Sequence, residues 1–151
     1  METTGIQTLT HFIGGQNVEG QSGRFGDVFN PTTGEVIAKV PLATREETRE
    51  AIAEAQAAFP AWRDVSVAKR AQVLLNFRNL LTQHLDELLA IICRESGKTI
   101  EDAKGEVTRG IESVDLAIGA PHLVKGEYSV NVGGNINAYS AKYPLGVVAA
   151  I

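Results

Sequence analysis

One charged side chain in this sequence is well placed for ligand recognition, namely Arg109. The helical pattern around it puts Arg109 nearly opposite the apolar side of its helix, at about 100° per residue. Its guanidinium could pair with Glu106 or Glu112, three residues away, for roughly a few tenths of a kcal/mol. Alternatively, the guanidinium fork could bind the carboxylate of a ligand. Residue chemistry alone leaves both interpretations open and favours the ion pair.

No nucleophile, metal site or phosphate loop can be assigned from residue types and spacing. Cys93 is the only thiol, and its place at the end of an apolar helix indicates a packing role. The histidines, His11, His84 and His122, lack the spacing of metal ligands. Glu95-Ser-Gly-Lys98 lacks the upstream glycine of a phosphate-binding loop, and no dinucleotide-binding glycine pattern occurs. We therefore assign no catalytic, cofactor-binding or metal-binding residue in this sequence.

Composition and charge argue against several classes of partner. The 151 residues are 44% hydrophobic and 21% charged, as in ordinary soluble domains. The net charge is -4 and the lysines and arginines are scattered, which argues against nucleic acid. No apolar stretch is long enough to span a membrane, and the first five residues do not resemble a secretory signal. We expect a cytoplasmic protein, or a mitochondrial matrix protein if a eukaryotic targeting segment has been removed.

The elements that would position these side chains fall into three zones, and the first, residues 9–42, is rich in β-structure. The segment His11–Val18 predicts a hairpin, because Gly14 and Gly15 can supply the positive φ angles of a tight turn. A second hairpin is expected around the turn Asn30–Gly34. Pro41 is expected to end its second strand.

The second zone, residues 44–119, predicts four helices. Thr44 and Glu47 form a capping-box pattern at the start of the first helix, and Pro60 is expected to stop it. Gly97 is expected to end the third helix, and Thr99 to open the fourth. The apolar residues expected on buried faces are Ile52, Ala55 and Phe59, then Val73, Leu74, Phe77 and Leu81, then Leu85, Leu88, Leu89 and Ile92, then Ala103, Val107, Gly110, Ile111, Val114 and Ile118.

The third zone, residues 125–151, returns to β-structure. Alternation from Tyr128 to Val132, a Gly133-Gly134 turn and a polar strand up to Tyr143 predict a hairpin that needs another surface. The apolar run 144–151 predicts a strand buried on both faces, as in parallel sheets. Such a strand needs further strands and crossovers, and none follow it. We therefore expect a truncated part of a larger α/β enzyme that is inactive by itself.

Several segments resemble the N-terminal third of aldehyde dehydrogenases, in matching order and spacing from about His11 to Ile151. These segments are Asn30–Pro41, Ala61-Trp62, Arg70, Glu95–Lys98 and Tyr143–Val148. Two further segments are most similar to the methylmalonate-semialdehyde dehydrogenases, a group within this superfamily that acylates coenzyme A. They are Gly105–Val114 and Gly119–Pro121.

The resemblance implies an incomplete α/β fold in three parts. Residues 1–124 would be the N-terminal part of a Rossmann-type NAD-binding domain, with β-hairpins followed by four helices. Residues 125–143 would form a β-hairpin of the oligomerisation element, and residues 144–151 the truncated first Rossmann strand. The complete enzyme would be a homo-oligomer, either a dimer or a tetramer.

The activity that the resemblance implies is oxidation of a small aldehyde with NAD as the cofactor. A cysteine thiolate attacks the aldehyde, hydride passes to NAD, and the thioester goes to coenzyme A or to water. Members of the semialdehyde group act on malonate and methylmalonate semialdehydes, forming acetyl-CoA and propionyl-CoA. In that group an arginine at the position of Arg109 helps to bind the substrate carboxylate, which favours the binding role for this residue. The family's catalytic cysteine, glutamate and NAD loop come after Ile151, and Cys93 matches none of them.

Three alternatives stay open at this point. The chain could belong to another aldehyde dehydrogenase, such as a succinate-semialdehyde type. It could instead be a short interaction module that pairs with complete dehydrogenase subunits by β-strand addition. An unrelated helical binding domain is the third, and the segment order and the abrupt apolar terminus count against it.

Overall fold

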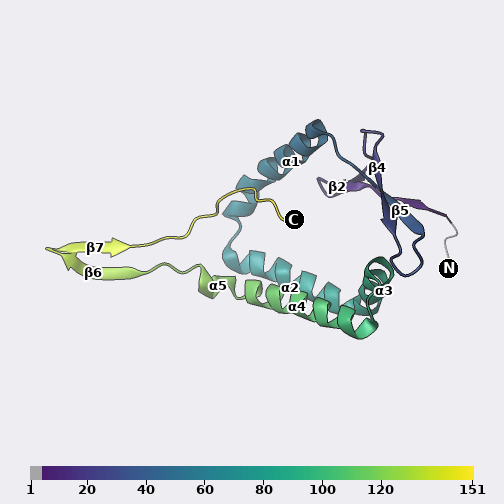
Figure 1. Ribbon diagram of the computed structural model, residues 1–151. Coiled ribbons are helices and arrows are strands. Elements are labelled where there is room, and N and C mark those ends of the chain that lie inside the picture. Colours follow the sequence, from purple (N-terminus) through teal and green to yellow (C-terminus); the bar gives the residue numbers. More distant parts are fainter. Residues whose placement is uncertain (1–4) are drawn as a thin grey trace.

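The computed structural model describes residues 5–151 and opens with a small three-stranded sheet and a separate hairpin (Figure 1). In the sheet, β5 pairs in parallel with β1 on one side and antiparallel with β4 on the other. The hairpin joins β2 to β3 through Gly14 and Gly15, both at positive φ. Both predicted hairpins are therefore confirmed. The strands are β1 (Gln7–Thr8), β2 (His11–Ile13), β3 (Gln16–Val18), β4 (Phe25–Phe29) and β5 (Val36–Pro41).

The first helix, α1 (Arg45–Asp64), begins with the predicted capping box. The Thr44 hydroxyl accepts a hydrogen bond from the Glu47 amide (3.1 Å), and the Glu47 carboxylate accepts one from the Thr44 amide (2.7 Å). The same carboxylate accepts a third bond from the Gln21 amide (2.6 Å). These amides, that of Thr44 foremost, hold the pKa of the largely buried Glu47 carboxyl below its usual value of 4.5. Glu47 thus joins the loop before β4 to the start of α1.

The prediction that Pro60 stops this helix is wrong, because α1 continues through Pro60 to Asp64. A proline removes one main-chain hydrogen bond and costs about 3 kcal/mol, but the residues after it can keep helical angles. Here the Arg63 guanidinium lies over the Phe59 ring, 5.9 Å from its centroid, and so bridges the turn that contains the proline. The helix ends where Val65 becomes extended, one residue before the cap of the next helix.

Three further helices form a packed layer, α2 (Val67–Gln83), α3 (Leu85–Ser96) and α4 (Ile100–Ile118). The closest helix packing is between α2 and α4, and α3 lies at the end of this pair where α2 ends and α4 begins (Figure 1). An ion pair between Arg78 of α2 and Asp115 of α4 (3.2 Å) spans their exposed edge. The short helix α5 (Ala120–Leu123) follows α4 directly, so helical structure continues a few residues beyond the predicted zone 44–119.

The predicted buried faces hold for α3 and, apart from the exposed Gly110, for α4, but only in part for α2. The face predicted for α1 is wrong for Ile52, which is 53% exposed, and for Ala55, which is exposed, because no other helix packs against that side.

In α2, Leu74 and Leu81 are half-buried as expected, and Ala71, one turn before Leu74, is buried. Val73 and Phe77 are instead 51% and 48% exposed. Val73 precedes Leu74 by one residue and so lies about 100° around the helix from it. The buried face predicted for α2 was therefore too wide, because α4 covers the side of Leu74 and leaves the side of Val73 exposed.

The end of α3 is fixed by Gly97, as predicted. Gly97 has a φ of 68°, in the left-handed region, and its amide donates to the Cys93 carbonyl (2.9 Å). A Cβ at Gly97 would lie 3.0 Å from a ring carbon of Pro31, in the turn between β4 and β5. Both the backbone conformation and this close approach require glycine at Gly97. The third helix is thereby placed against the sheet.

The last zone extends away from the helices as a two-stranded hairpin (Figure 1). Strands β6 (Tyr128–Gly133) and β7 (Ile136–Tyr139) pair antiparallel, and every residue in them is exposed. The predicted second strand is shorter than expected, because it ends at Tyr139 instead of Tyr143. Residues 144–151 form no strand; they pass along α1, where Val147 and Val148 lie near Phe59. A strand requires a hydrogen-bonded neighbour, and this segment has none among residues 5–151.

A large apolar surface remains uncovered in this fold. The accessible surface is 11876 Å², whereas a compact monomer of 16.2 kDa is expected to expose about 7,400 Å². Among residues 5–151, the buried apolar residues are mostly small, namely Ala38, Pro41, Ala71, Leu89 and Ala103. No helix in the described part of the chain is long and apolar enough to cross a membrane. The fold is thus a mixed α/β assembly whose apolar faces are mostly open to solvent.

Candidate functional site

The candidate site lies on α4, whose start is firmly fixed by Thr99. The Thr99 hydroxyl accepts a hydrogen bond from the Asp102 amide (3.2 Å) and donates one to the Asp102 carboxylate (2.9 Å). Glu101 and Asp102 in the first turn also interact favourably with the positive end of the helix dipole. The predicted N-cap at Thr99 is therefore confirmed, and it sets the register of every later side chain on this helix.

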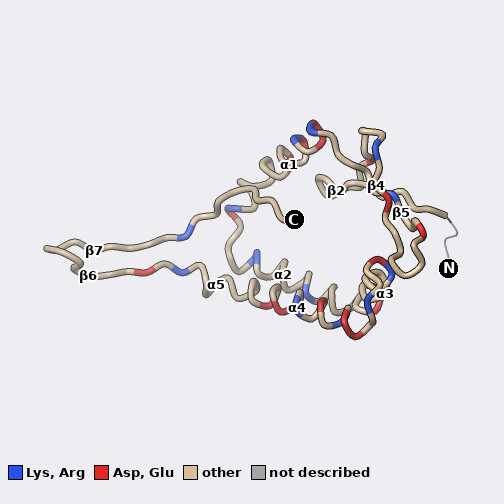
Figure 2. Tube along the Cα trace, in the orientation of Figure 1, with Lys and Arg blue, Asp and Glu red and all other residues tan. Residues whose placement is uncertain are grey.

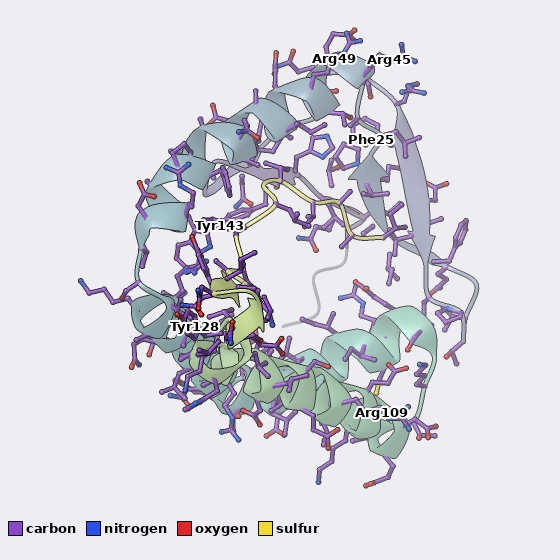
Figure 3. All side chains as sticks on the ribbon, turned by 90° about the vertical axis from the view of Figure 1, so that its left-hand side faces the viewer. Phe25, Arg45, Arg49, Arg109, Tyr128 and Tyr143 are labelled. Atoms are coloured by element: carbon purple, nitrogen blue, oxygen red, sulfur yellow. The ribbon has the colours of Figure 1, made fainter. Side chains whose placement is uncertain are left out.

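The orientation of α4 about its axis is set by its apolar side. Ala103 is 0% exposed, and Val107, Ile111 and Val114 are half-buried on the side that packs against α2 and α3. Because Arg109 lies nearly opposite this stripe, its side chain is exposed, as the sequence predicts. Figure 3 labels Arg109 on this helix.

Arg109 borders a shallow groove of about 340 Å³ along the first half of α4. Figure 2 shows how Lys, Arg, Asp and Glu gather along α3 and α4, whereas the far part of the hairpin carries none. The groove is lined by Lys98, Glu101, Asp102, Gly105, Glu106 and Arg109.

Arg109 has no ion-pair partner among residues 5–151. Lys98 pairs with Glu106, and no ion pair or hydrogen bond joins the Arg109 guanidinium to Glu106 or to Glu112. In the described part of the chain Arg109 therefore forms neither of the two ion pairs considered from the sequence, and Glu106 pairs with Lys98 instead. An arginine presents a rigid fork of donors, and here that fork is free for a ligand acceptor.

The functional groups of the groove are three carboxylates and two cationic side chains. Its lining includes no thiol, histidine or hydroxyl, and Cys93 is half-buried on α3, outside the lining. His84 contacts Glu87 at a helix boundary (3.1 Å), and the Nε2 atom of His11 is buried near the first hairpin without a hydrogen bond. No group of three metal-ligating side chains occurs within residues 5–151.

Gly105 is a part of this groove for which the sequence-based reasoning predicted no functional role, although helical periodicity places it on the same side as Arg109. It lies four residues before Arg109 and lines the same groove. A glycine inside a helix costs about 0.5–1 kcal/mol relative to alanine, and Gly105 is one of two such residues in α4, with Gly110. An isolated glycine within a strongly helical pattern was the signal that could have identified this position.

Comparison with known proteins places these features in one family. The aldehyde dehydrogenase family model matches residues 17–151. The malonate-semialdehyde dehydrogenase of Pseudomonas aeruginosa is 55% identical over 144 residues, which are 95% of this chain and 29% of that protein. The methylmalonate-semialdehyde dehydrogenase of Oceanimonas doudoroffii superposes with a TM-score of 0.87 at 46% identity, covering 93% of this chain and 28% of that one.

A third relative carries a cofactor. A protein of Sinorhizobium meliloti, assigned as a methylmalonate-semialdehyde dehydrogenase and complexed with NAD, superposes with a TM-score of 0.90 at 42% identity. The match covers 95% of this chain and 29% of that one, so the present chain spans less than a third of the length of these relatives. The chain belongs to the aldehyde dehydrogenase family and corresponds to its N-terminal part.

Proposed function

We propose that this chain is the N-terminal part of an NAD-dependent dehydrogenase that oxidises malonate or methylmalonate semialdehyde to the acyl-CoA. The observation that carries the proposal is the exposed Arg109, which has no ion-pair partner among residues 5–151 and lies on a helix fixed at both its cap and its apolar side. The relatives named for these two substrates are 42–55% identical to the chain, which supports the same substrate class.

Arg109 is proposed to bind the substrate carboxylate. Both semialdehydes carry a carboxylate, and two parallel N–H bonds from a guanidinium match its geometry. The groove also contains the carboxylates of Glu101, Asp102 and Glu106 against only Lys98 and Arg109. An anion would therefore bind weakly to this exposed face alone. The rest of the enzyme would strengthen the binding of the substrate carboxylate by supplying a second cation and by excluding water from the groove.

The chemistry itself requires residues outside this chain. NAD needs a cradle of backbone amides at a glycine-rich turn, and residues 5–151 contain no such loop. The described residues therefore do not fit NAD or coenzyme A by themselves. What this chain contributes is the placement of Arg109, which would orient the bound semialdehyde.

We further propose a division of labour among the three parts of the chain. Residues 1–124 would support the NAD-binding domain, and residues 144–151 would become its first Rossmann strand once neighbouring strands are present. Residues 125–143 would mediate assembly into a dimer or tetramer. The fully exposed strands β6 and β7 support this assignment, since a lone two-stranded hairpin is marginal without another surface.

The same hairpin supports one alternative function. The chain could act as a short module that pairs with complete dehydrogenase subunits through the free edges of β6 and β7. This alternative predicts that the isolated chain co-purifies with an intact dehydrogenase. An isolated chain that is a monodisperse monomer would count against it.

The proposed function can be tested in a chimera, in which this chain replaces the matching segment of the Pseudomonas aeruginosa malonate-semialdehyde dehydrogenase. We expect NADH formation from malonate semialdehyde and a much lower rate with 3-methylbutanal, its uncharged isostere. Coenzyme A should accelerate turnover and appear as acetyl-CoA, while the carboxylate carbon of the substrate leaves as CO2. A chimera that folds and binds NAD but uses both aldehydes equally well would contradict the proposed substrate class.

A further inference from the structure

We infer that Gly105 determines specificity, by keeping open the space beside Arg109 that the substrate carboxylate enters. This inference rests on the proposed function and extends it to a residue that has no side chain. It concerns the size of the side chain at Gly105, whereas the proposed function concerns the charge of Arg109.

The geometry of α4 places the two residues together. Residues four apart on a helix lie on the same face, and helical side chains lean toward the N-terminus. The Arg109 side chain therefore extends over the turn that contains Gly105, and both residues line the groove. A Cβ added at Gly105 would have no heavy atom within 4 Å. The space over Gly105 is thus open, and a ligand approaching the Arg109 fork would enter it.

The fold does not account for a glycine at this position. Gly105 does not have a positive φ, unlike Gly97, whose conformation and contact with Pro31 exclude other residues. Among residues 5–151, packing against neighbours does not require it either, since nothing surrounds the missing Cβ. Alanine would favour the helix more than glycine does at both Gly105 and Gly110, so what distinguishes Gly105 is its place in the groove beside Arg109.

The chain offers a matched control in Gly110. Gly110 also lies inside α4, is not at positive φ, and has no heavy atom within 4 Å of an added Cβ. It does not line the groove, because it lies about 140° around the helix from Gly105. Substitution of either glycine by alanine should have the same effect on the helix. Only substitution at Gly105 should affect the groove.

The test uses the chimera with the variants Gly105→Leu, Gly105→Ala and Gly110→Ala, assayed with malonate semialdehyde and with 3-methylbutanal. For Gly105→Leu we expect KM for malonate semialdehyde to rise about tenfold or more, with kcat/KM for 3-methylbutanal unchanged or higher. Gly105→Ala should shift KM in the same direction by a smaller factor, without lowering the thermal midpoint. Gly110→Ala should leave both substrates at the wild-type KM.

The remaining outcomes overturn the inference. A wild-type KM for malonate semialdehyde in both Gly105 variants would mean that the space is not used. An equal loss with both aldehydes would mean that the side chain blocks the site in general and does not determine specificity. If Gly105→Leu fails to fold, Gly105→Ala alone decides by the same criterion. Failure of the proposed function is distinguishable, because the unsubstituted chimera would then not prefer malonate semialdehyde.

Discussion

The two sides of α4 contrast in what their residues do. On the inner side, Ala103 is completely buried and its neighbours one and two turns on pack against α2 and α3. On the outer side, Gly105 and Arg109 are exposed. Among the described residues, the Arg109 guanidinium has no ion-pair partner, and the space where a Gly105 side chain would lie is open. The inner side determines where the helix lies, and the outer side presents a groove. Substitutions on the inner side should therefore affect stability, and substitutions on the outer side should affect ligand binding.

The largest expected effect on stability comes from Ala103→Leu. Ala103 has no exposed surface, so three added carbons must displace α2 or α3, at a cost of about 1–3 kcal/mol. Hydrogen exchange of the α2 and α4 amides, measured by mass spectrometry in the chimera, should accelerate accordingly. The matched control on the outer side is Leu116→Ala, because Leu116 is 67% exposed and its exchange should hardly change. Equal acceleration in both variants would remove the distinction between the two sides.

A second expected effect separates the glycine that the fold requires from the one that it does not. Gly97→Ala must place a Cβ at a φ of 68° and 3.0 Å from Pro31, which should cost about 1–2 kcal/mol. Gly105→Ala should instead leave stability unchanged or raise it. Thermal unfolding of the two variants measures the difference. Similar midpoints for both would show that the end of α3 does not depend on glycine.

A smaller effect is expected for the pH dependence of the buried carboxylate. The pKa of Glu47 is lowered in the folded chain, so its stabilising contribution is present above pH 4.5 and is lost as the pH falls below that value. Glu47→Gln should make the thermal midpoint less dependent on pH in this acid range. Glu46→Gln is the control, because Glu46 is exposed in the same turn and forms a long, exposed ion pair with Arg49 (3.8 Å). Parallel pH profiles for Glu47→Gln and the unsubstituted chain would contradict the assigned role.

Local signals in the sequence predicted local features well. The capping box at Thr44, the cap at Thr99 and the left-handed Gly97 each depend on residues within one or two turns, and all three are present. The exposed position of Arg109 followed from helical periodicity alone. The failure at Pro60 shows the limit of a local stop signal, since a contact between side chains four residues apart spans the proline.

Features that depend on distant residues could not be predicted in the same way. The bond from Gln21 to Glu47 joins residues 26 apart, and no local pattern indicates it. The exposure of Val73 and Phe77 depends on where α4 crosses α2. The strand predicted for residues 144–151 needs hydrogen-bonded neighbours that the described residues do not provide, and it remains a prediction for a longer chain. The groove beside Arg109 was not predicted from the sequence, because it depends on the absence of a side chain at Gly105.

The most direct test of this account compares Arg109→Leu with the unsubstituted chimera on the two isosteric aldehydes. Loss of a charge-assisted bidentate contact should lower kcat/KM for malonate semialdehyde about 10- to 100-fold. Turnover of 3-methylbutanal and the thermal midpoint should stay close to those of the unsubstituted chimera, because Arg109 has no partner within residues 5–151. An equal loss with both aldehydes, or no loss with malonate semialdehyde, would contradict the carboxylate-binding role of the outer side of α4.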